Sequence, residues 1–144
     1  MRIPMKVDYG VRALVDLALH ADGTPVRTAD IAGRQNIPEP YLDQLLTSLS
    51  KFGFIRSRRG PHGGHVLARP PEEVNLGMVI STLEGNNSLL DCIQEPTECT
   101  MAAGCGQRGI WQEVEAAVQS ILRRTTLADL ANRQGFPAAQ QAQN

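Results

Sequence analysis

The chain has 144 residues, of which 42% are hydrophobic and 20% are charged, and its formal net charge is -1. This length corresponds to one ordinary domain. No apolar run approaches the roughly 18 residues of a membrane span, and the opening MRIPMKVDYG lacks the apolar core of a secretory signal. We therefore expect a cytoplasmic protein with no membrane partner.

The small net charge hides an uneven distribution of charge along the chain. Residues 1–71 hold ten Lys and Arg against six Asp and Glu, whereas residues 72–144 hold four against nine. Between Gln44 and Pro71 there are five basic residues, two histidines and no carboxylate. Such a basic segment is typical of a surface that contacts nucleic acid.

Three helices are predicted in the first half of the chain. The first covers residues 7–20, where apolar residues repeat at helical spacing. The second is short and has Thr28 as its predicted N-cap, and a turn at residues 36–38 separates it from a third helix that begins near Glu39. This order predicts a helix-turn-helix.

The third predicted helix has two distinct faces. Its inward face is apolar and is made by Leu42, Leu45, Leu46, Leu49 and Phe52. Its outward face carries hydrogen-bonding groups, namely Tyr41, Asp43, Gln44, Thr47, Ser48 and Lys51. We expect the outward face to meet solvent or a partner.

A β-hairpin is predicted after Gly53, with strands over residues 54–57 and 65–68 and a glycine-rich turn at residues 60–64. Three helices followed by a basic hairpin define a winged helix-turn-helix, a mainly α fold with a small β wing. The alternative is a solvated domain with polar outer faces, and the carboxylate-free hairpin argues against it.

The predicted DNA contacts lie on the helices and on the wing. A helix-turn-helix places its second helix in the major groove, where polar side chains contact base edges and cations hold phosphates. We expect base or sugar contacts from Tyr41, Gln44 and Thr47 and a phosphate contact from Lys51. Thr28, at the start of the second helix, is also expected to contact DNA. Backbone or minor-groove contacts are expected from Arg56, Arg58, Arg59 and His62.

The second half of the chain contains the remaining predicted elements. Asn75 is expected to cap a helix over residues 76–84, which completes a DNA-binding domain at residues 1–84. Residues 85–106 show little periodicity and are predicted to form a loop that contains the cysteines.

A long helix follows this loop, and Thr126 caps a short last helix, both within residues 107–133. A disordered tail is expected at residues 134–144. The seam of the long helix is apolar and consists of Ile110, Val114, Ala117 and Ile121.

All three cysteines lie within 14 residues, in the pattern Cys92-x6-Cys99-x5-Cys105. An odd number in a short window suits a metal or redox site better than a disulfide framework. Thiolates are the chief ligands of iron-sulfur clusters, and the close Cys-x2-Cys pairs of structural zinc sites are absent. Buried thiols, or a thiol-disulfide switch without iron, remain alternatives.

The chain resembles the Rrf2 family of bacterial winged-helix regulators over nearly its whole length. The markers are MRIPMKVDYGVRALVDLAL, IPEPYLDQLLTSLSKFGFIRSRRGPHGGHVLARPPEEVNLGMVISTLEG, and the three cysteines ending in CGQRGIW. The resemblance implies a homodimer that binds double-stranded, partly palindromic promoter DNA, with the long C-terminal helix as the dimer contact. It also implies that Asp43 tunes the choice of site.

The resemblance further implies a 2Fe–2S or 4Fe–4S cluster, because family members with three cysteines at about this spacing hold one. The chain departs from the best-known pattern in two ways. Six residues rather than five separate Cys92 from Cys99, and Arg108 stands where one branch of the family has a histidine ligand. Asp8 matches the position from which nitric-oxide-sensing members donate a carboxylate, and its alternative is an ordinary first-turn acid.

The expected function is therefore a promoter-binding regulator, in the first place a repressor, controlled by a cluster that senses iron, redox state or nitric oxide. No catalytic constellation is evident, so we expect neither an enzyme nor a small-molecule substrate. The alternatives are a cluster-free thiol-redox regulator of the same fold, a metal or redox module that does not bind DNA, and an adaptor that has lost DNA recognition.

Overall fold

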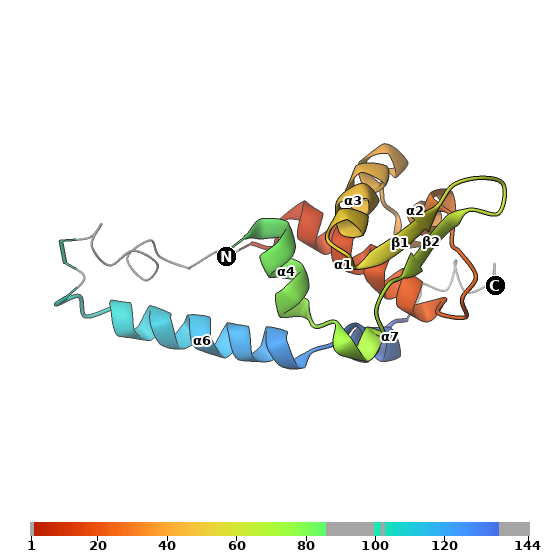
Figure 1. Cartoon of the computed structure of the whole chain (residues 1–144). Coiled ribbons are helices and arrows are strands. Elements are labelled where there is room, and N and C mark those ends of the chain that lie inside the picture. Colours follow the sequence, from red (N-terminus) through yellow and green to blue (C-terminus); the bar gives the residue numbers. More distant parts are fainter. Residues whose placement is uncertain (1, 86–99, 102, 136–144) are drawn as a thin grey trace.

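The computed structural model describes residues 2–85, 100, 101 and 103–135. Its elements in chain order are α1 (Met5–Leu19), α2 (Thr28–Gln35), α3 (Glu39–Lys51), β1 (Ile55–Arg58), β2 (Gly64–Leu67), a 3-10 turn η1 (Pro71–Glu73), α4 (Leu76–Glu84), α6 (Arg108–Arg124) and α7 (Leu127–Arg133). Figure 1 shows a body of short helices with the hairpin on one side and α6 extending from it. The predicted fold, mainly helical with a small wing, is confirmed.

A single apolar core holds the body together. Its buried side chains come from α1, α2, α3, the start of the hairpin, α4 and α7. Leu14, Ile31, Leu42 and Leu49 are 0% exposed. Burial of such side chains is the main force that stabilises a small domain. The predicted inward leucines of α3 are therefore confirmed.

Two details of the helical prediction are wrong. The N-cap of α2 is Arg27, which makes no side-chain cap bond, and Thr28 is instead the first helical residue. Phe52 lies at the C-cap of α3 and is 48% exposed, because the helix ends at Lys51 and the chain reverses at Gly53, whose φ is +83°, so that Phe54 enters the core instead. The first helix begins two residues earlier than predicted, and the strands shift by one residue.

Both predicted caps in the second half are confirmed. The Asn75 side chain accepts a hydrogen bond from the Met78 amide at 2.9 Å. Thr126 and Asp129 form a capping box at the start of α7, and the hydrogen bond from the Thr126 backbone lowers the pKa of Asp129 below its ordinary value. Backbone hydrogen bonds of Leu76 to Thr125 and of Leu127 to Val74 join the two capped ends.

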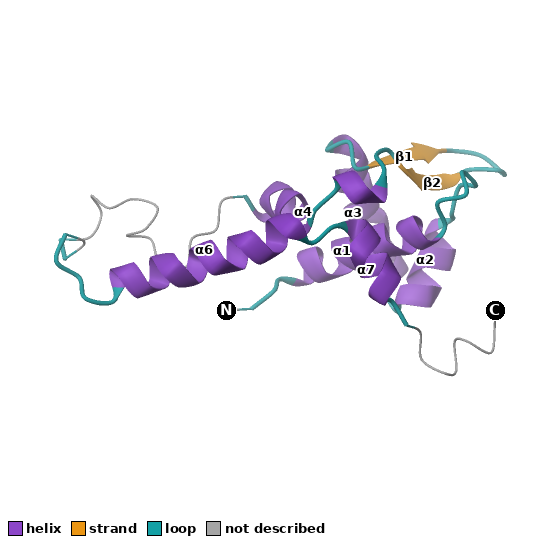
Figure 2. Cartoon of the chain, turned by 90° about the horizontal axis from the view of Figure 1, so that it is seen from below, coloured by secondary structure: helices purple, strands orange, loops and turns teal. Residues whose placement is uncertain are grey.

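Helix α6 has little contact with the body. None of its residues is buried, and its main contact with another helix or strand is with α4. Figures 1 and 2, seen from directions 90° apart, both show its N-terminal end far from α1, α2 and α3. Among the described residues no helix is both long and apolar enough to cross a membrane.

Candidate nucleic-acid interface and cysteine segment

A buried ion pair fixes α2 against α1. Asp16 is 0% exposed and receives hydrogen bonds from Arg34 Nε at 2.9 Å, from Arg34 Nη2 at 2.8 Å and from Gln35 Nε2 at 3.0 Å. The hydrogen bonds to Asp16 raise the pKa of Arg34 above its ordinary value. A buried charge needs such complete pairing, because an unpaired one costs several kcal/mol. The network thus sets the position of the helix that precedes the predicted recognition helix.

The outer face of α3 carries the predicted base-contacting residues. Tyr41, Asp43, Gln44, Thr47 and Lys51 are all exposed. The ring of Tyr41 meets Tyr9 of α1 edge-on, with the centroids 5.6 Å apart, so α1 supports its position. The Thr47 hydroxyl donates to the Asp43 carbonyl at 2.9 Å, which leaves its oxygen available as an acceptor.

The wing presents its polar residues in two directions. The strands pair in antiparallel register, with Ser57 opposite His65 and Arg56 opposite Val66. Because side chains alternate along a strand, Ser57 and His65 share one face of the hairpin, whereas Arg56 and Val66 share the other. The tip of the hairpin turns through Gly60, whose φ is +109°, and it carries the exposed side chains of Arg59 and His62.

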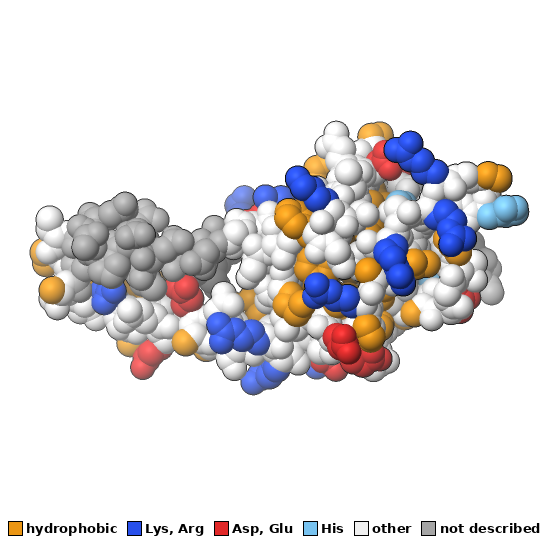
Figure 3. Space-filling view, viewed as in Figure 1, with side chains coloured by type: hydrophobic (Ala, Val, Ile, Leu, Met, Phe, Trp, Pro, Cys, Tyr) orange, Lys and Arg blue, Asp and Glu red, His pale blue; other side chains and the backbone are white. Residues whose placement is uncertain are grey.

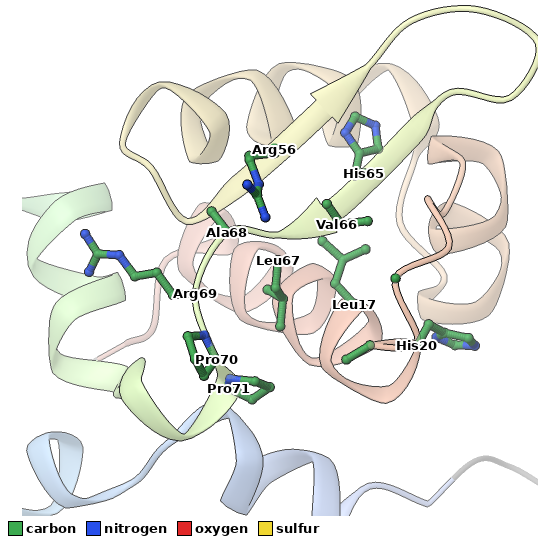
Figure 4. Close-up of a pocket in the computed structure, with 12 residues that line it drawn as sticks. Leu17, His20, Arg56, His65, Val66, Leu67, Ala68, Arg69, Pro70 and Pro71 are labelled. Carbon is green, nitrogen blue, oxygen red and sulfur yellow. The ribbon is translucent and has the colours of Figure 1, made fainter.

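The outer face of the wing is basic and partly hollowed. An open hollow of about 420 Å³ lies between the hairpin, the end of α1 and residues 69–71. In Figure 4, Arg56 extends from β1 over the hairpin toward this hollow, whose other wall includes Leu17 and Leu67. Figure 3, in the same view as Figure 1, shows Lys and Arg side chains spread over this part of the surface and few carboxylates between them.

His65 is the residue of this region whose role the sequence did not indicate. Its Nε2 lies 2.8 Å from Thr28 Oγ1, and its Nδ1 lies 2.7 Å from Ser57 Oγ. Burial lowers the pKa of His65 below its ordinary value, and the nearby Asp43 carboxylate acts in the opposite direction. Thr28, predicted as a cap and as a DNA contact, is therefore engaged with the wing.

The structure describes only part of the predicted cluster site. Cys92 and Cys99 lie outside the described residues, and Cys105 is a free, partly exposed thiol just before α6. Within the described ranges there is no group of three or more potential metal-binding side chains. The cluster hypothesis therefore rests on the spacing of the three cysteines in the sequence and on the thiol of Cys105, which forms no disulfide.

Asp8, the predicted fourth ligand, has a partner within the chain. Its carboxylate receives two hydrogen bonds of 3.0 Å from Arg12, and it lines a shallow hollow with residues of α7. Cys105 precedes the other end of α6, whose 17 residues span roughly 25 Å. Asp8 therefore lies beside α7, which follows the C-terminal end of α6, whereas Cys105 precedes the N-terminal end of that helix.

The predicted dimer seam lies on the surface of α6. Ile110 is 58% and Ile121 is 50% exposed, Ala117 is exposed and Val114 is partly buried. Trp111, beside the seam, is 39% exposed and donates through Nε1 to the Gln107 side chain at 3.0 Å.

Comparison with known proteins adds an independent line of evidence. The family described as "Rrf2: Iron-dependent Transcriptional regulator" matches residues 3–133. The chain is 39% identical over 130 residues to Protein rrf2 of Nitratidesulfovibrio vulgaris, covering 90% of this chain and 87% of that protein. It is 35% identical over 144 residues to the HTH-type transcriptional regulator IscR of Serratia proteamaculans, covering 100% of this chain and 87% of that protein.

A solved structure agrees with these sequence matches. The structure of CymR, described as the global cysteine regulator of B. subtilis, superposes with a TM-score of 0.80 at 32% identity, covering 94% of this chain and 99% of that one. The sequence matches and this structural similarity span the winged helix as well as α6 and α7. The chain therefore belongs to the Rrf2 family of transcriptional regulators.

Proposed function

We propose that this chain acts as a homodimeric repressor that binds double-stranded promoter DNA through α3 and the wing, under the control of an iron-sulfur cluster. The observation that carries the DNA-binding part is the exposed polar face of α3 beside a carboxylate-free basic wing, in a chain of a transcriptional regulator family. The α3 face supplies groups for the base edges, and Lys51, Arg59 and His62 supply phosphate or minor-groove contacts.

Dimerisation would place two winged helices on one palindromic site. A helix with an apolar seam and no buried residue gains little stability from its own chain beyond its contact with α4, because most helical stability in proteins comes from packing of the apolar face. A second copy of α6 supplies the same apolar seam, and such self-complementary contacts are usual in twofold dimers. Half-sites about one helical turn apart would then be read together.

Cys92, Cys99 and Cys105 would hold the cluster, with Asp8 of the second chain as a candidate fourth ligand. A cluster bound there supplies a redox-active and labile centre, whose state responds to iron, oxidants or nitric oxide. The cysteine segment directly precedes the dimer helix, so gain or loss of a cluster there would change the geometry of the two half-sites and with it the affinity for DNA.

The test is anaerobic purification followed by an absorption spectrum and iron and sulfide analysis. Gel shifts of the holo and apo proteins on the upstream region of their own gene follow, at stated salt concentrations. A coloured protein whose DNA affinity changes when the cluster is lost would support the proposal. A colourless, iron-free protein would end the cluster part, and an absence of specific DNA binding would end the regulator part.

The fourth ligand has a matched test of its own. Asp8→Ala removes the carboxylate, whereas Arg12→Gln removes its ion-pair partner, together with the Arg12 bond to the Gln35 carbonyl, and leaves the carboxylate in place. If Asp8 is a ligand, Asp8→Ala alters the spectrum or the lability of the cluster and Arg12→Gln leaves both nearly unchanged. An unchanged spectrum in Asp8→Ala would restrict Asp8 to its ion pair with Arg12.

A second candidate is a regulator of the same fold that responds through its thiols without a cluster. The similarity to CymR, described as a global cysteine regulator, favours it. It predicts iron-free protein under anaerobic conditions and a DNA affinity that depends on a reversible thiol oxidant.

A further inference from the structure

His65 connects three segments of the DNA-binding body. Its backbone amide donates to the Val26 carbonyl at 2.8 Å, and its carbonyl accepts from the Val26 amide at 2.9 Å. Its imidazole contacts Thr28 Oγ1 at 2.8 Å through Nε2 and Ser57 Oγ at 2.7 Å through Nδ1. One residue of β2 is therefore hydrogen-bonded to the loop before α2, to the first residue of α2 and to β1.

The hydroxyl partners suit a neutral imidazole. A neutral ring offers one N–H donor and one acceptor nitrogen, and a hydroxyl is able to donate or accept, so both contacts are satisfied in either tautomer. The backbone next to the ring is also closely packed. A Cβ at Gly64, whose φ is +148°, would lie 2.7 Å from the Val26 carbonyl oxygen. Only a glycine permits this approach of the hairpin to the loop before α2.

The contact with Thr28 gives the wing a fixed position relative to the helix-turn-helix. The tip residues of the wing, up to His62, precede His65 by three or more positions, which corresponds to roughly 10 Å along a strand. A rotation of the hairpin by about 10° at His65 would therefore displace the tip by about 2 Å, more than a binding site tolerates without losing contacts. The side-chain bond to α2 opposes that rotation.

We propose that His65 is a positioning residue that ties the wing to the start of α2 and thereby sets where the wing tip meets the minor groove beside α3. This inference rests on the proposed DNA-binding function and adds a determinant of wing placement to it. It assigns Thr28 a role as the helix-side partner of His65.

Three substitutions of His65 separate its two side-chain bonds. His65→Phe keeps a ring of similar size and removes both bonds. His65→Gln places an amide near the position of Nε2 and keeps the bond to Thr28, whereas His65→Asn places an amide near Nδ1 and keeps only the bond to Ser57. All three variants are first compared with the wild type by thermal melting, so that a loss of fold is seen directly.

The probe is a duplex selected by the wild-type chain from random-sequence DNA. We expect His65→Phe to weaken binding about tenfold and to lose hydroxyl-radical protection of the flanking minor groove, while protection of guanine N7 in the major groove persists. His65→Gln should restore most of the flanking protection, and His65→Asn should not. Wild-type affinity and footprint in His65→Phe would overturn the inference, and so would equal rescue by Asn and Gln.

A double-mutant cycle tests the same contact from the helix side. Thr28→Val removes the hydroxyl at nearly constant volume, and its effect should not add to that of His65→Phe, because both variants remove the same bond between Thr28 and His65. Lys51→Gln, which removes a proposed phosphate contact of α3 outside the wing, is the matched control, and its effect should add to that of Thr28→Val. Additive effects of Thr28→Val and His65→Phe would overturn the inference. If the wild-type chain selects no duplex at all, the proposed DNA-binding function fails. That result differs from a wild-type chain that binds DNA and a His65→Phe variant that binds it equally well, which would overturn only the role of His65.

Discussion

Helices α1 and α6 are similar in length but differ in what surrounds them. Seven of the 15 residues of α1 are buried, and one of these is the charged Asp16. None of the 17 residues of α6 is buried, although its apolar seam is as regular. The body therefore encloses its own apolar and ionic contacts, whereas the apolar seam of α6 lies largely exposed on the described part of the chain.

The largest expected effect concerns the buried ion pair of the body. Asp16→Ala leaves Arg34 without its carboxylate partner, and breaking a buried pair in this way costs about 3–5 kcal/mol. The measurement is the free energy of unfolding in urea. The control is Asp30→Ala, which removes an exposed pair with Arg27 and should cost less than about 1 kcal/mol. Equal losses in the two variants would show that the body does not depend on its buried charge.

The second prediction addresses α6. Ile121→Glu places a charge in the apolar seam, and we expect the dissociation constant of the dimer to rise by about 100-fold or more, since the charge would be buried without a partner. Sedimentation velocity measures this change. Gln112→Glu adds the same charge on the opposite side of α6 and should leave the dimer intact. A wild-type chain that is monomeric at micromolar concentration would contradict the proposal that α6, unlike α1, packs against a second chain.

The third prediction concerns the junction between α6 and the body. Thr126→Ala removes the capping box of α7 and should lower the free energy of unfolding by about 1 kcal/mol. Thr100→Ala, at an exposed turn position, serves as the control and should have little effect. A silent Thr126→Ala would mean that the packing of α7 on α1 alone holds the junction.

The smallest effect is the pH dependence of the wing contact. Because burial lowers the pKa of His65 in the folded chain below its ordinary value of 6.5, the unfolded chain binds more protons near that pH. The stability of the wild type should therefore be complete above about pH 6.5 and fall as the pH drops through the lower folded pKa. His65→Phe should show a shallower fall over the same range in denaturant unfolding. Parallel curves would contradict this prediction.

Much of the body follows from local sequence chemistry. The spacing of the leucines in α3 predicts its buried face, and the order of three helices and a basic hairpin predicts the winged helix. Asn75 and Thr126 are recognisable as caps because a cap bonds an amide only two or three residues away. The whole-chain resemblance to the Rrf2 family points in the same direction, and the family match over residues 3–133 confirms it.

The sequence by itself determined the helices, the wing, the two caps and the composition of the α6 seam, since each depends on neighbours close along the chain. Only the tertiary structure decided that Asp16 is buried against Arg34, that Phe52 is exposed, and that Thr28 meets His65 across 37 residues instead of capping α2. Such contacts depend on how the elements pack, and local spacing carries no record of which side chain lies opposite another.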